Sequence, residues 1–114
     1  MVELLNNLKK QKAFNMDTAL KEAYTHYIRE QLQPFEEIHK IIIFGSFFRA
    51  QNPNDIDVAV VQNSHSNFLT LSLKYRKALR ELSKKIPLDI VPVKENFQGA
   101  FAQEIENGQI IYEK

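Results

Sequence analysis

The chain has 114 residues, of which 44% are hydrophobic and 25% are charged, and its formal net charge is +1. These values fit one domain with a modest core, and they exclude a strong overall attraction to nucleic acid or to a membrane surface. The lack of cysteine excludes disulfides and thiolate metal sites, and apolar runs such as residues 41–44 are far too short to cross a bilayer.

The N-terminal part of the chain predicts two helices. Residues 1–12 lack the apolar stretch of a signal peptide, so we expect a cytoplasmic protein. Residues 2–11 fit a short helix, and Asp17 fits the N-cap of a second helix that runs to about residue 33, before Pro34. The apolar positions of this second helix recur at helical spacing: Leu20, Ala23, Tyr24, Tyr27 and Ile28.

Two strands are expected next. Residues 40–44 form a β-branched run that ends at Gly45-Ser46, and such a run is typical of a buried strand. Asn52-Pro53-Asn54 is a turn signal. Residues 55–61 then predict the second strand.

Residues 67–86 give the strongest helix prediction in the chain, and Pro87 ends it. Its apolar residues fall three or four apart on one face: Phe68, Leu71, Tyr75, Leu79, Leu82 and Ile86. A solvated face is the favoured interpretation of its basic residues, and contact with an acidic partner or RNA is the alternative; they are Lys74, Arg76, Lys77, Arg80, Lys84 and Lys85.

Residues 88–93 predict a third strand, which Pro92 places at a sheet edge. A last helix is expected over residues 96–107 with Gly108 as its stop, and residues 109–112 fit a final short strand. The whole pattern predicts an α/β (α+β) fold, a small mixed sheet with helices packed on it. We expect a single domain over residues 1–114, with N-terminal helices in 1–33 and the core in 35–114.

Three aspartates lie within predicted strands whose other residues are apolar. Side chains alternate along a strand, so Asp55 and Asp57 point the same way, and Asp89 sits in the third strand as Leu88-Asp89-Ile90-Val91. If the second and third strands are neighbours, the three carboxylates meet. A divalent cation relieves their repulsion, and oxygen ligands suit Mg²⁺ or Mn²⁺. Three such acids can hold two ions about 3.5–4 Å apart, as in-line phosphoryl transfer requires.

Gly45 and Ser46 end the first strand and predict a phosphate cradle. Glycine lets the backbone approach a ligand closely, so Gly45 is expected to tolerate no bulk. The Ser46 hydroxyl is expected to cap a following helix, whose backbone N–H groups and dipole favour an anion. Of the two aromatic residues that follow, Phe47 and Phe48, we expect one to pack inward and the other to border a nucleotide base.

The stretch Phe44-Gly45-Ser46-Phe47-Phe48-Arg49, followed by Asn54-Asp55-Ile56-Asp57-Val58, resembles the signature of the DNA polymerase beta-like nucleotidyltransferases. Asp89 resembles the third acid of that family, and the ending over residues 105–112 is similar to that of its short bacterial members, the minimal nucleotidyltransferases. The resemblance covers about residues 35–114. Ala50, where many members carry glycine, departs from the pattern.

The resemblance implies a role for each matching residue. Gly45 and Ser46 would bind the triphosphate, and Arg49 would touch a phosphate, with a solvated surface position as the alternative. Asp55 and Asp57 would bind both metal ions. Asp89 would bind the catalytic ion near the acceptor hydroxyl and help to remove its proton.

Two functions follow from the resemblance and stay open. The first is metal-dependent transfer of a nucleoside monophosphate, AMP from ATP, to a hydroxyl acceptor on a partner protein, as the antitoxin half of a toxin–antitoxin pair. The second is a non-catalytic antitoxin module that neutralises a small helical partner of the HEPN type. We expect no direct nucleic-acid binding and no membrane contact. The catalytic core takes up nearly all of residues 35–114, which leaves little chain for an acceptor site. We therefore expect a separate protein to complete that site, either the helical partner or a second copy of this chain.

Overall fold

A four-stranded sheet in the order β3-β2-β1-β4 forms the centre of the fold. The computed structural model describes residues 16–99 and 102–114. The strands are β1 (Ile38–Phe44), β2 (Ile56–Gln62), β3 (Leu88–Val93) and β4 (Gln109–Glu113). Strand β1 pairs antiparallel with β2 and β4, whereas β2 and β3 run parallel. The predicted mixed sheet is therefore confirmed, with β3 at an edge as Pro92 indicates.

Four helices accompany the sheet in the described part of the chain: α2 (Thr18–Leu32), α3 (Phe68–Ala78), α4 (Arg80–Ser83) and α5 (Ala102–Glu106). Two of them begin at a side-chain cap, and the cap at Asp17 is the predicted one. The Asp17 carboxylate accepts a hydrogen bond from the Leu20 N–H at 3.0 Å, and the Asn67 side chain accepts one from the Thr70 N–H at 2.8 Å. None of the helices in residues 16–99 and 102–114 is long and apolar enough to span a bilayer. The helix predicted over residues 2–11 lies outside the described residues.

Two helix predictions are wrong in extent. The helix expected over 67–86 breaks at Leu79, whose φ of −102° and ψ of 20° leave the helical region. After this bend, α4 still presents Leu82 to the core, and Ile86 is buried beyond it. The helix expected from residue 96 is absent up to residue 99, because Gly99 has φ +119°, a value that no helix contains.

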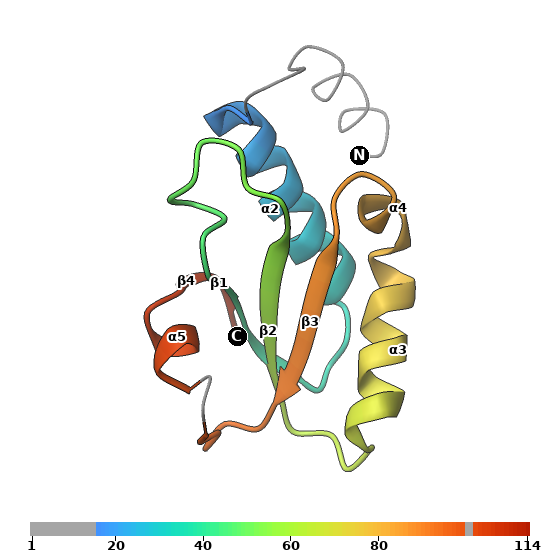
Figure 1. Cartoon of the computed structure of the whole chain (residues 1–114). Helices are drawn as coiled ribbons and strands as arrows, with labels where there is room; N and C mark the ends of the chain where they lie inside the picture. The colour runs from blue at the N-terminus through green and yellow to red at the C-terminus, as the bar shows by residue number, and fades with distance from the viewer. Residues whose placement is uncertain (1–15, 100–101) are drawn as a thin grey trace.

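The two faces of the sheet carry hydrophobic clusters of unequal size. Figure 1 shows the helices and strands that contribute to them. On one face, α2 and α3 pack against alternate strand residues such as Ile41, Val58 and Ile90. On the other face, the short helix α5 contributes Ile105 to a small cluster with Ile42, Phe44, Ala59 and Val61. Both faces of β2 are thus covered. Phe68 does not belong to the buried face predicted for the helix over residues 67–86. Its side chain is 58% exposed, and the buried face begins one turn later at Leu71.

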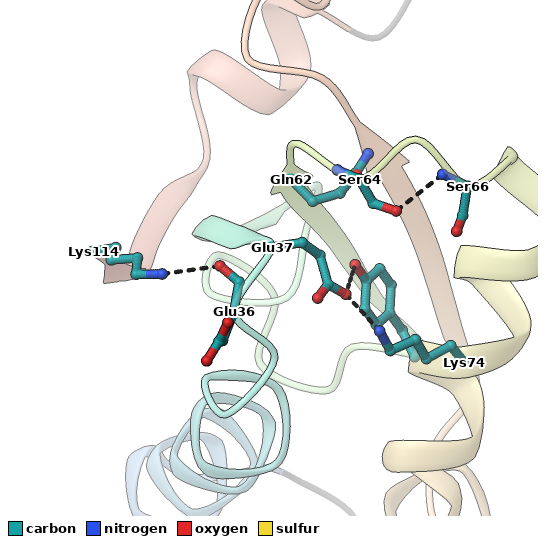
Figure 2. Close-up of polar contacts among 8 residues, drawn as sticks. Glu36, Glu37, Gln62, Ser64, Ser66, Lys74 and Lys114 are labelled. Carbon is teal, nitrogen blue, oxygen red and sulfur yellow. Dashed lines mark hydrogen bonds and ion pairs between the residues drawn. The ribbon is translucent and has the colours of Figure 1, made fainter.

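A half-buried acid, Glu37, ties α3 to the start of β1 (Figure 2). The Glu37 carboxylate accepts hydrogen bonds from Lys74 Nζ at 2.8 Å and from the Tyr75 hydroxyl at 2.9 Å. Burial alone raises the pKa of Glu37, but these hydrogen bonds and one from its own backbone outweigh it, and the net pKa is lowered. Lys74 also lies over the ring of Phe35, 4.5 Å from its centroid.

Glu37→Gln is expected to lower the free energy of unfolding by about 1–2 kcal/mol, because it removes a charge-assisted acceptor of two hydrogen bonds. The lowered pKa means that the ionised form stabilises the folded state. This contribution is present above the pKa of the unfolded chain and disappears as pH falls through the folded value. Urea unfolding at pH 7 and pH 3.5 measures it, with the exposed neighbour change Glu36→Gln as control. An equal loss at both pH values would contradict this account.

Candidate functional site

The parallel pairing of β2 and β3 places two of the predicted acids side by side. Asp57 and Asp89 are register partners, each the second residue of its strand. They share the sheet face that α5 covers, since Ala59 and Val91, two residues further along each strand, pack there. Asp55 lies just before β2 and is exposed, as is Asp89, whereas Asp57 is half-buried. The predicted pairing of the second and third strands is therefore confirmed, and it brings Asp57 beside Asp89.

The electrostatics of this site centre on Asp57. Burial raises the pKa of Asp57 most, and the negative charges of Asp55, Asp89 and Glu104 raise it further. An array of oxygen donors that repel one another is chemistry suited to a divalent cation. Within the described residues, no three histidine or acidic side chains are already arranged around one metal position. The donor set thus fits a magnesium ion in kind, and joint metal binding by the three aspartates stays a prediction.

Gly45 ends β1 directly beside Asp57. Its φ is +74°, a conformation that L side chains rarely adopt, and a Cβ atom built there would lie 2.4 Å from Asp57 Oδ2. The glycine is therefore required twice, by its backbone angle and by the carboxylate against it. The structure gives a further reason for the predicted intolerance of bulk, since the Gly45 backbone and the acid cluster touch each other.

The segment after Gly45 is a single turn, so the expectation that Ser46 caps a helix is wrong. The Ser46 carbonyl accepts hydrogen bonds from the N–H groups of Arg49 at 3.1 Å and Ala50 at 2.8 Å, and no further helical bonds follow. The chain instead leaves towards α2, where the Met16 N–H donates to the Gln51 carbonyl at 3.1 Å. Without a helix, any attraction for an anion comes from the turn itself and from the Arg49 side chain, not from a helix dipole.

Arg49 lies against the turn. Its Nη2 donates to the Gly45 carbonyl at 3.1 Å, and its side chain is exposed. This contact holds the guanidinium beside the end of β1. Ser46 is also exposed. Gly45 and Arg49 thus line one surface next to Asp57, and their joint role with Ser46 in binding phosphate stays a prediction.

Lys21 of α2 also contacts this turn, and no sequence pattern predicts that contact. Its ammonium donates to the carbonyls of Phe48 and Ala50, and so anchors the turn from 27 and 29 residues away. Phe47 is buried in the larger core, and Phe48 is half-buried with its ring edge-on to Phe47 at a centroid distance of 5.0 Å. The expectation that one of the two rings packs inward is therefore confirmed. The expectation that the other borders a nucleotide base stays a prediction.

Helix α5 brings two further polar residues to the site. Glu104 and Asn107 line a cavity of about 370 Å³ together with Gly45 and Arg49. Glu104 is also close enough to Asp57 for its charge to act on that carboxyl. No sequence signal identifies either residue, because only the packing of α5 on the sheet brings them there.

Comparison with known proteins agrees with this arrangement. Residues 26–114 match the family model described as polymerase beta, nucleotidyltransferase. The crystal structure of the toxin–antitoxin complex MntA–HepT contains a similar chain, with 16% sequence identity and a TM-score of 0.54 over 82% of this chain and 73% of that one.

A protein of Sulfolobus solfataricus, provisionally assigned as a nucleotidyltransferase, is similar with 16% identity and a TM-score of 0.52, over 84% of this chain and 82% of that one. At this level of identity the two likenesses show a shared fold. No curated protein matches the sequence.

Gly45→Ala is expected to weaken ATP binding at least tenfold, because the new methyl group must displace the Asp57 carboxylate. Backbone strain at positive φ should also cost roughly 1–2 kcal/mol of stability. Gly99→Ala is the matched control, since Gly99 has φ +119° but nothing within 4 Å of the added Cβ. Isothermal titration with Mn-ATP measures binding. Similar affinities for the two variants would show that the contact between Gly45 and Asp57 does not matter for the ligand.

Proposed function

Because the chain belongs to the polymerase beta nucleotidyltransferase family and is a nucleotidyltransferase, we propose that it transfers AMP from ATP to a hydroxyl group on a partner protein. The observation that carries this proposal is the pairing of Asp57 with Asp89 next to Asp55, beside the turn at Gly45. An acid cluster next to a potential phosphate surface suits a triphosphate substrate.

Each residue has a part in the proposed reaction. Asp55, Asp57 and Asp89 hold two Mg²⁺ ions, for which Mn²⁺ can substitute, and these ions neutralise the triphosphate and polarise its α-phosphorus when bound. The backbone at Gly45 and Ser46, with the Arg49 guanidinium, holds the triphosphate tail. Asp89, exposed at the sheet edge, accepts the proton of the acceptor hydroxyl.

The bond changes balance in one displacement. The acceptor oxygen forms a bond to the α-phosphorus as the bond from this phosphorus to the oxygen bridging the β-phosphate breaks. Pyrophosphate leaves with the electron pair of the broken bond. The products are a phosphodiester on the acceptor and pyrophosphate, with the hydroxyl proton on Asp89.

A second candidate function is a non-catalytic antitoxin module that binds and neutralises a helical partner of the HEPN type. An exposed apolar patch on α3 favours a protein partner: Phe68 is 58%, Leu69 65% and Leu73 58% exposed. Leu69 and Leu73 lie one turn apart and therefore share a helix face. Both candidates involve a protein partner, and they differ in whether AMP is transferred to it.

Asp57→Asn is expected to separate catalysis from folding. The raised pKa of Asp57 means that its ionised form destabilises the folded state at pH 7. The variant should therefore melt at a higher temperature than the wild type at pH 7. This difference should close as pH falls through the raised pKa, because the wild-type carboxyl is then neutral as well.

The same variant should lose the binding of Mn-ATP and the increase in melting temperature that Mn-ATP gives the wild type. Calorimetric titration and thermal scans measure the two effects. A variant that binds Mn-ATP as the wild type does would refute the proposed metal site. A variant that fails to bind and also melts lower would indicate damage to the fold.

The partner proposal predicts a stable complex on co-expression with the product of the adjacent reading frame, detected by native mass spectrometry. An added mass of AMP on the partner supports the enzymatic function, and a complex without it supports the binding module. Leu69→Ser with Leu73→Ser should abolish the complex, whereas Ile110→Ser, at an apolar residue of β4 that is 49% exposed, should preserve it. A strictly monomeric protein that modifies a free small molecule would rule out the partner.

A further inference from the structure

We propose that Glu104 and Asn107 of the α5 region bind the sugar hydroxyls of the nucleotide and so make the site selective for ribonucleotides. This inference rests on the proposed function, because it concerns the same triphosphate site. It assigns a specificity role to two residues that lie outside the recognised sequence motif.

Packing fixes the direction in which these two side chains point. Ile105, between them in sequence, is 1% exposed and inserts into the cluster formed by Ile42, Phe44, Ala59 and Val61. Gly108 lies so close to β1 that an added Cβ would be 2.7 Å from Ile42 Cγ2 and 2.8 Å from the Ile43 carbonyl oxygen. These two contacts prevent α5 from rotating about its axis. Glu104 and Asn107, three residues apart, therefore remain on the wall of the cavity.

Two chemically different pairs of residues line the cavity. Gly45 and Arg49 come from the turn after β1 and suit a phosphate, and Glu104 and Asn107 come from the α5 region. A carboxylate repels phosphate oxygens and accepts hydrogen bonds, whereas an amide both donates and accepts. In the part of the chain that the structure describes, neither the Glu104 nor the Asn107 side chain forms a hydrogen bond or ion pair. Both side chains are thus available to a neutral, hydroxyl-bearing group held beside the phosphates.

The sugar of a nucleoside triphosphate meets these requirements. It is uncharged, carries adjacent 2′ and 3′ hydroxyls, and is joined directly to the α-phosphate, at which the proposed reaction takes place. A carboxylate that accepts from such a hydroxyl is an established way to recognise ribose. Loss of one hydrogen bond to a charged group should lower affinity by about tenfold to a hundredfold.

The test compares the affinities of Mn-ATP, Mn-2′-deoxy-ATP and Mn-3′-deoxy-ATP by calorimetry. The wild type should bind ATP at least tenfold more tightly than one or both deoxy analogues. Glu104→Ala and Asn107→Ala should weaken ATP binding to about the level of the analogue that lacks the contacted hydroxyl, and should change the binding of that analogue less than twofold. Glu106→Ala is the control, since Glu106 is exposed on the same helix and does not line the cavity.

Equal affinity of the wild type for all three nucleotides would overturn the inference and leave the proposed function intact. A uniform loss for all three nucleotides in Glu104→Ala would also overturn it, because Glu104 would then act on the metal or the phosphates. A wild type that binds none of the three would overturn the proposed function and the inference together. Because Glu104 is exposed, the variants are expected to keep the wild-type melting temperature, and thermal scans check this.

Discussion

The parallel register of β2 and β3 is the constraint on which the rest of the site depends. It aligns Asp57 with Asp89 at the start of both strands, so two carboxylates that are 32 residues apart become neighbours. A parallel pair needs a crossover, and α3 and α4 supply it on the face that also carries α2. The crossover therefore stays clear of the carboxylates, which lie on the opposite face.

The larger hydrophobic cluster and the candidate site lie on opposite faces of the sheet. Most of the buried apolar surface lies between α2, α3 and one face of the sheet, where Tyr24, Ile28, Tyr75 and Leu79 are fully enclosed. The other face is covered by five-residue α5 and a small cluster. A short cover leaves the starts of β2 and β3 open, and the acids can then stay charged in contact with solvent. A larger helix there would enclose them at a considerable cost in desolvation.

The turn proposed to bind phosphate packs directly against the Asp57 carboxylate. Gly45 touches the Asp57 carboxylate, Arg49 holds the Gly45 carbonyl, and Lys21 holds the far end of the same turn from α2. Phe47 anchors this turn in the larger core. These contacts explain how a connection that forms no helix keeps a defined shape, and they couple the geometry of the site to the packing of α2.

Local signals were sufficient for much of this protein. The cap at Asp17, the helical spacing of apolar residues after residue 67, the β-branched run before Gly45 and the alternation around Asp57 are local signals. They predicted α2, the start of α3, the sheet strands and the spacing of Asp55, Asp57 and Asp89. The break at Leu79, the single turn after Ser46, and the places of Lys21 and Glu104 were decided by tertiary structure. Each depends on contacts between segments distant in sequence, and such contacts leave no periodic or local trace in the chain.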